Sequence, residues 1–148
     1  MKILHRDNYL SAIINAVFST QYRNLWVIDN EIKIDILQDG KLSCAVFVSS
    51  ILKLFGLIDE QRATVESAVI AMIKYGWQEI DVNDIQPGDV IVWNKRTGKD
   101  GETHGHIGFY VGEEKAISNS VKLRKIVQHG WDYGGRRKIE KVLRWNWE

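Results

Sequence analysis

The chain has 148 residues but only one cysteine, Cys44, and one proline, Pro87, and its formal net charge is +1. A single cysteine excludes an intrachain disulfide framework and leaves the redox compartment open. The near-zero net charge gives no reason to expect a nucleic-acid partner. The chain also lacks internal repeats and a Pro-, Gly- or Ser-rich linker. We therefore expect a single domain over residues 1–148 and a monomer.

Long apolar runs are missing as well. No stretch of about 18 apolar residues occurs, so we expect no membrane span. We also expect no signal peptide. Such a segment needs an unbroken apolar core, and in MKILHRDNYLSAIINAVFST the polar residues 5–8 interrupt the apolar run almost at once. We therefore expect a protein that is cytoplasmic as synthesised.

The first half of the chain carries helical patterns. A helix is predicted behind Asp7 as its cap, with apolar residues at helical spacing: Leu10, Ile13, Ile14 and Val17. A second helix is predicted to begin near Ser43 or Cys44 and to end at Gly56. A third is predicted roughly from Thr64 to Lys74.

The rest of the chain is rich in short β-type patterns. LWVIDNEIKIDI predicts two strands around Asp29 and Asn30, and five later runs alternate in the same way: DVIVW, HIGFYVG, KAISNS, KIVQHGWDY and KIEKVLRWNW. Helices followed by strands indicate an α+β fold, with N-terminal helices packed on a C-terminal antiparallel sheet.

Cys44 is placed by these patterns at the start of the second helix. A thiolate is the nucleophilic form of cysteine, and a helix N-terminus stabilises it through unpaired N–H groups and the helix dipole. The alternative interpretation is a small buried side chain in the first turn of a core helix, since free cysteines are often buried.

A cysteine nucleophile requires a base, and two histidines precede an apolar strand pattern. His106 opens HIGFYVG, and His104 lies two residues before it. Strand alternation places His106, Gly108 and Tyr110 on one face and the intervening apolar residues on the other. Gly108 leaves space beside the imidazole.

A third group must hold the imidazole in the correct orientation. After a turn at residues 113–114, the strand KAISNS should run back beside His106. Asn119 has an amide oxygen that can accept an imidazole N–H, and Ser118 and His129 are the alternatives.

Taken together, these segments resemble the NlpC/P60 and CHAP group of papain-like cysteine peptidases and amidases. The resemblance rests on SCAVFVSSIL, DIQPGDVIVW and GHIGFYVGEEKAISNS, in that order, and covers roughly residues 39–120. It implies a papain-like α+β fold, with Cys44 as nucleophile, His106 as general base and then acid, and Asn119 as orienter. It further implies hydrolysis of peptide or amide bonds, in peptidoglycan or another amide-containing substrate, through a thioester and without metal or organic cofactor.

One departure from the peptidase branch concerns Ser43. That branch usually has Asp at this position, where it holds the free amine of the substrate, so Ser43 is a substrate-binding candidate of different chemistry. The branch's upstream Tyr also has no clear equivalent, with Tyr22 the nearest candidate. These departures favour the amidase-like side of the group. A wall hydrolase of this kind would reach its target by a non-Sec route or by phage-lysin-like release.

Two other functions remain open. Cys44, His104, His106 and His129 form a possible zinc ligand set, although their spacing matches no short zinc signature. An inactive binding module of the same fold is the other alternative, with Trp145 and Trp147 as a ligand surface rather than core residues. The basic runs KLRK and RRK are expected to be solvated.

Overall fold

The computed structural model describes residues 1–148 and has three helices, eight strands and one short 3-10 helix. The helices are α1 (His5–Asn15), α2 (Cys44–Leu54) and α3 (Val65–Tyr75), with η1 at Val82–Asp84. The strands are β1 (Trp26–Asp29), β2 (Ile32–Asp35), β3 (Gln78–Ile80), β4 (Val90–Thr97), β5 (Thr103–Gly112), β6 (Lys115–Ser120), β7 (Lys125–Gly130) and β8 (Ile139–Arg144).

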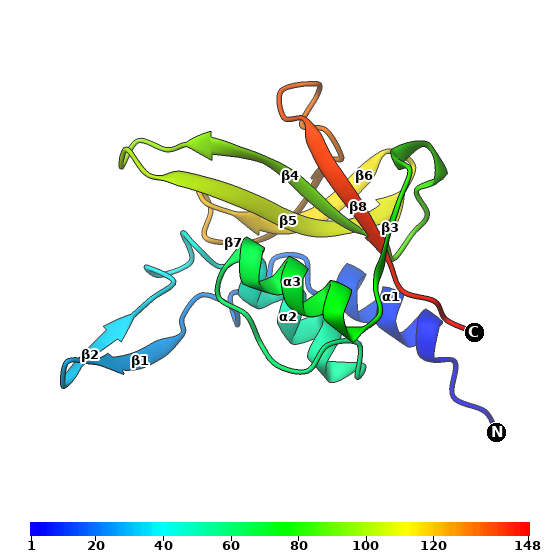
Figure 1. Ribbon diagram of the computed structural model, residues 1–148, viewed down its shortest axis with the longest axis horizontal. Helices are drawn as coiled ribbons and strands as arrows, with labels where there is room; N and C mark the ends of the chain where they lie inside the picture. The colour runs from blue at the N-terminus through cyan, green and yellow to red at the C-terminus, as the bar shows by residue number, and fades with distance from the viewer.

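Six strands form one antiparallel sheet in the order β3-β8-β4-β5-β6-β7. The three helices lie against one side of this sheet (Figure 1). The predicted α+β fold, with N-terminal helices packed on a C-terminal antiparallel sheet, is therefore confirmed. Strand β3 was not predicted from the sequence, because its three residues are too few to show a period, and pairing with β8 defines it.

Local signals fixed most helix ends. The Thr64 hydroxyl accepts a hydrogen bond from the Ser67 backbone N–H and caps α3, and Gly76 ends this helix with a φ of 125°. The expectation for the first helix is corrected, because α1 begins at His5, and Asp7 lies inside its first turn rather than at the cap. Leu4 is the cap residue, and its carbonyl accepts the first helical hydrogen bond from the Asn8 backbone N–H at 3.0 Å.

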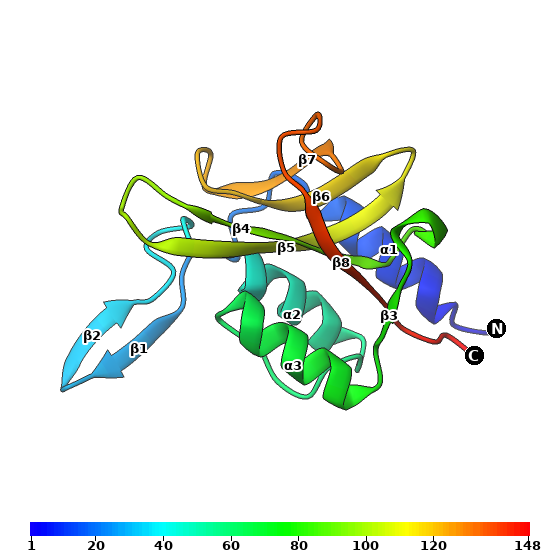
Figure 2. The same ribbon diagram turned by 45° about the horizontal axis from the view of Figure 1, so that its top comes forward.

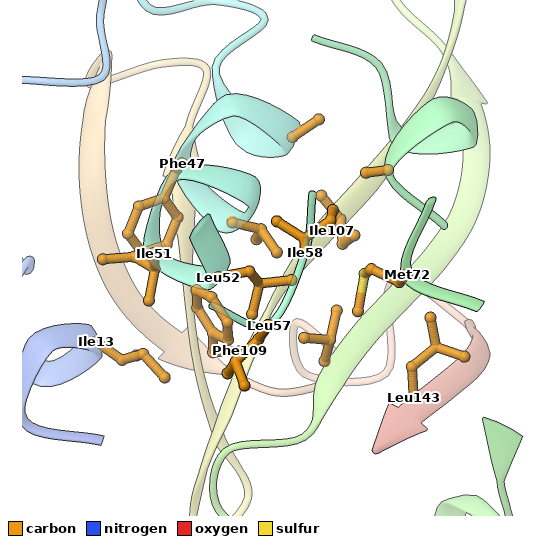
Figure 3. Packing of buried hydrophobic residues seen from close by; sticks show 14 of the residues in the cluster. Ile13, Phe47, Ile51, Leu52, Leu57, Ile58, Met72, Ile107, Phe109 and Leu143 are labelled. Atoms are coloured by element: carbon orange, nitrogen blue, oxygen red, sulfur yellow. The ribbon is translucent and has the colours of Figure 1, made fainter. Parts of the chain in front are cut away.

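The main core lies between the helices and the sheet. Figure 3 shows Phe47, Ile51 and Leu52 of α2 meeting Ile107 and Phe109 of β5. Phe47 and Phe109 pack edge to face with ring centroids 5.4 Å apart. Burial of these side chains stabilises the layer by roughly 2 kcal/mol each.

The opposite face of the sheet carries a smaller apolar cluster around Trp93 and Tyr110. Because side chains alternate along a strand, the odd-numbered residues Ile107 and Phe109 face the helices, while His106 pairs with Trp93 on the far face. The predicted division of this strand into two faces is confirmed.

The hairpin β1–β2 extends away from the helices and the large sheet (Figures 1 and 2). Its pairing around Asp29 and Ile32 confirms the predicted two strands. No helix combines the length and apolar character that crossing a membrane requires.

Candidate active site

The site begins at Cys44, the first residue of α2. The preceding segment turns through Gly40, whose φ of 89° favours glycine and whose close approach to Arg124 leaves no room for a side chain. Cys44 is half-buried and packs beside the main core. Ser43 is fully buried, and its hydroxyl has no hydrogen-bond partner.

Strand β5 presents a free backbone N–H toward this helix end. Tyr110 directs its N–H toward β4, where it donates to Asp89, so alternation turns the N–H of Ile107 toward β6. The pairing of β5 with β6 stops at Phe109 and Ile117. The Ile107 N–H is thus outside the ladder and acts on the thiol of Cys44.

Burial raises the pKa of the Cys44 thiol above its ordinary value. The backbone N–H groups of Ile107 and Ala45 and the positive charge of Arg137 act in the opposite direction but do not overcome it. The resting thiol is therefore protonated at neutral pH.

His106 lies buried on the far face of β5, with its ring centroid 5.0 Å from that of Trp93. Its Nε2 is 3.0 Å from the Ser118 hydroxyl and 2.7 Å from the Tyr133 hydroxyl. Its Nδ1 makes no hydrogen bond to another side chain. A Cβ at Gly108 would lie 2.7 Å from Ser118 Cβ, so this glycine allows the close approach of β6.

His129 stands behind Ser118 and determines the direction of the hydrogen bonds. Its Nδ1 is 2.8 Å from the Gly130 carbonyl, which can only accept, so Nδ1 carries the proton. In a neutral imidazole Nε2 then accepts, and the Ser118 hydroxyl, 2.6 Å away, must be the donor.

The same logic sets the tautomer of His106. We assign the His106 proton to Nε2, from which the Ser118 oxygen accepts because its own proton is committed to His129; the Tyr133 hydroxyl, 2.7 Å from Nε2, then directs its proton away from the ring. The lone pair of His106 then lies on Nδ1. This chain of hydrogen bonds from Gly130 through His129 and Ser118 to His106, called the relay below, leaves a base with one free nitrogen.

Both histidines of the relay are neutral. Burial, with smaller effects of the charges of Arg137 and His129, lowers the pKa of His106 to about 3. Burial also lowers the pKa of His129, against a hydrogen bond to Gly130 that raises it. The donor and acceptor assignments above require both imidazoles to be neutral, and the lowered pKa values agree with this.

Asn119 is not brought to the imidazole. It lies on the helix-facing side of β6, one residue out of phase with Ser118, and its side-chain nitrogen donates to the Gly40 carbonyl at 2.7 Å. It therefore ties β6 to the segment that precedes Cys44. The structure places both alternatives, Ser118 and His129, beside His106 instead. No hydrogen bond joins the Cys44 sulfur to His106 in this structure.

Three residues of the site were not predicted from the sequence: Trp93, Tyr133 and Arg137. Tyr133 stacks on His129 with ring centroids 4.1 Å apart and reaches His106 from the connection between β7 and β8. Its placement depends on the conformation of this loop, in which Tyr133 itself has a φ of 55°, and no local sequence pattern predicts that conformation. The expectation that RRK is solvated is corrected for Arg137, which is half-buried, whereas its neighbours are exposed.

The zinc alternative is not supported by the geometry. No group of three or more His, Cys, Asp or Glu side chains is arranged to hold a metal ion. His104 pairs instead with Asp100 through Nε2 at 3.1 Å.

The C-terminal tryptophans pack largely against other aromatic rings. Trp145 stacks on Tyr75 at 6.1 Å and contacts Trp77, and Trp147 lies 5.1 Å from Tyr9. Their packing accounts for these residues without a ligand.

Comparison with models of known protein families identifies a family for this chain. The sequence model of a family described as bacteriophage peptidoglycan hydrolase (Amidase_5) matches residues 38–132, well over half of the chain. The matched range includes Cys44, His106, Ser118 and His129 and ends just before Tyr133 and Arg137. No curated protein matches the chain.

Proposed function

Because the chain belongs to the bacteriophage peptidoglycan hydrolase family, we propose that it hydrolyses an amide bond in peptidoglycan peptides with Cys44 as nucleophile. The observation that carries this proposal is the relay, which leaves Nδ1 of His106 as a free basic nitrogen in the residue before Ile107, whose backbone N–H acts on the Cys44 thiol. A nucleophile, a base and an orienter are the minimum set for this chemistry.

In the first half of the reaction, His106 Nδ1 takes the thiol proton while Cys44 Sγ attacks the carbonyl carbon of the scissile amide. Burial disfavours each ion alone, but thiolate and imidazolium formed together stabilise each other in a low dielectric. The tetrahedral intermediate collapses as His106 returns the proton to the leaving nitrogen, and a thioester of Cys44 remains.

In the second half, water attacks the thioester carbonyl and gives its proton to His106. Collapse breaks the C–S bond, the sulfur regains the proton and the carboxylic acid is released. The oxyanion of both intermediates would be stabilised by the backbone N–H of Cys44, which is unpaired at the helix N-terminus.

The relay supports each step by holding the proton of His106 on Nε2. When Nδ1 becomes protonated, Nε2–H still donates to Ser118, so the imidazolium keeps this partner. We propose Ser118, backed by His129, as the orienter in place of Asn119.

The resemblance to the NlpC/P60 and CHAP group fits this assignment, because the third residue of that group also follows His on the next strand. Membership of a phage family supports release to the wall in the manner of a lysin. Ser43 is buried, which supports a role in shaping the helix start more than direct contact with substrate.

The decisive experiment is digestion of purified peptidoglycan by the wild type, Cys44→Ala and Cys44→Ser, with product masses read out. We expect both variants to lose activity by at least about 10³-fold, since the nucleophile is removed or made much weaker. The masses identify the bond, because amidase and endopeptidase cleavage release different ends. Equal activity of Cys44→Ala and wild type would reject the mechanism.

A further inference from the structure

Arg137 bonds to the backbone of the two central strands β4 and β5. Its Nε and Nη2 donate to the Asn94 carbonyl at 3.2 and 3.0 Å, and Nη2 also reaches the His104 carbonyl at 3.4 Å. Asn94 sits where the register between β4 and β5 shifts, so its carbonyl is available to a side chain. Asn94 follows Trp93, the residue paired with His106. Arg137 is therefore held rigidly near the base.

This guanidinium has no acidic partner. The six ion pairs of the protein involve neither Arg137 nor Arg96. Arg96 makes no side-chain hydrogen bond and pairs in the β4–β5 ladder with His104, whose carbonyl accepts from Arg137. Burial is the main cause that lowers the pKa of Arg137, and the charge of Arg96 adds to it. A half-buried cation is normally paired, because partial desolvation without a counter-charge costs free energy. Two arginines near each other without a carboxylate form a site suited to an anion.

The positive charge of Arg137 acts on both proposed reacting groups, Cys44 and His106. Arg137 lowers the pKa of both the Cys44 thiol and the His106 imidazole, although burial is the larger influence on each. A ligand group bound to Arg137 would thus lie near the scissile bond. Ser43, in the position before the nucleophile, adds no negative charge.

We propose that Arg137, assisted by Arg96, binds a free carboxylate of the substrate next to the scissile amide. The substrate class is then a peptidoglycan peptide that carries an unamidated side carboxylate at the cleavage point, such as a glutamate residue with one carboxyl group free. The free Nη1 of Arg137 can donate to a carboxylate, and a planar guanidinium matches carboxylate geometry. This inference rests on the proposed hydrolase function.

The test uses two synthetic stem peptides that differ only in a free carboxylate against a carboxamide at that residue. We expect the wild type to have the higher kcat/KM on the acid. Arg137→Gln should lower kcat/KM on the acid by about 10-fold to 100-fold more than on the amide, mainly through KM, and any loss that the two peptides share reflects the charge of Arg137 on the Cys44 thiol. Lys138→Gln, which removes an exposed charge one residue away, is the matched control and should leave the preference intact.

An equal loss on both peptides would overturn the inference, because the whole effect of Arg137 would then come from its charge on the thiol and none from a bound carboxylate. Equal rates of the wild type on acid and amide would overturn it too. Arg137→Lys keeps the charge and covers the case in which Arg137→Gln fails to fold; it should retain a reduced preference for the acid.

Binding to the Cys44→Ala protein separates this inference from the proposed function. Calorimetry should show tighter binding of the acid peptide than of the amide, and Arg96→Gln in the same background should reduce the difference. If the wild type hydrolyses nothing but this difference in affinity is present, the carboxylate site stands and the hydrolase proposal fails. If hydrolysis occurs but both peptides bind equally, the carboxylate site fails alone.

Discussion

The Ser118 hydroxyl lies 2.6 Å from His129 Nε2, and it must be the donor because His129 Nδ1 already donates to the Gly130 carbonyl. A serine on one strand thereby links two histidines on its neighbours. The consequence extends to His106, whose tautomer depends on a residue that it does not touch.

Removing His129, the acceptor of the Ser118 proton, should therefore alter the base. We expect His129→Phe, which keeps an aromatic ring to stack on Tyr133, to lower kcat by about 10-fold to 100-fold with little change in KM. Without His129 the Ser118 hydroxyl can donate to His106 Nε2, which moves the imidazole proton to Nδ1. Nitrogen NMR of the imidazoles should show Nδ1 of His106 unprotonated in the wild type and protonated in the variant. An unchanged tautomer together with an unchanged kcat would contradict the relay.

Asn119 should affect stability more than catalysis. Asn119→Ala leaves the buried Gly40 carbonyl without its donor, and we expect the free energy of unfolding to fall by about 1–3 kcal/mol. Urea unfolding measures this loss, and kcat of the folded variant should fall less than that of Ser118→Ala. The reverse order of kcat losses would restore Asn119 as the orienter.

Stability should depend on pH through His106. The pKa of His106 is about 3 in the folded protein and about 6.5 in an unfolded chain. Between these two pH values the unfolded state binds a proton at His106 and the folded state does not. The free energy of unfolding should therefore fall by about 1.4 kcal/mol per pH unit as pH drops from about 6.5 toward 3.

Urea unfolding between pH 6.5 and 4.5 isolates this contribution from most carboxylates. His106→Gln should reduce the slope by about one proton, and His5→Gln, at an exposed position, should leave it unchanged. A parallel slope in wild type and His106→Gln would show that His106 is not held neutral.

Gly108 should tolerate no side chain. A Cβ there would lie 2.7 Å from both the Ile117 carbonyl and Ser118 Cβ, and 3.1 Å from Trp93. We expect Gly108→Ala to cost about 1–3 kcal/mol of stability and to lower kcat by displacing Ser118. Gly130→Ala is the matched control, since its nearest atom would be 3.8 Å away; thermal unfolding and kcat compare the two.

Much of this protein could be predicted from local pattern. Alternation in HIGFYVG divided β5 into a core face and a polar face, and Thr64 and Gly76 marked the ends of α3 within a residue. These signals depend on neighbours in the chain, whose spacing is set by the period of a strand or a helix. The position of Cys44 at the start of α2 could be predicted for the same reason, from the helical spacing of the apolar residues that follow it.

Which of Ser118 and Asn119 contacts His106 depends on the tertiary structure. Adjacent strand residues point to opposite faces, so a one-residue difference in register decides which of them meets His106, and only the pairing of β5 with β6 sets that register. Tyr133 and Arg137 depended likewise on how one loop returns over the sheet. The sequence by itself determined the class of fold and the residue types available for catalysis, because these follow from periodicity and composition. The folded chain decided which of those residues face one another and which tautomer the base adopts, because both depend on contacts between segments far apart in sequence.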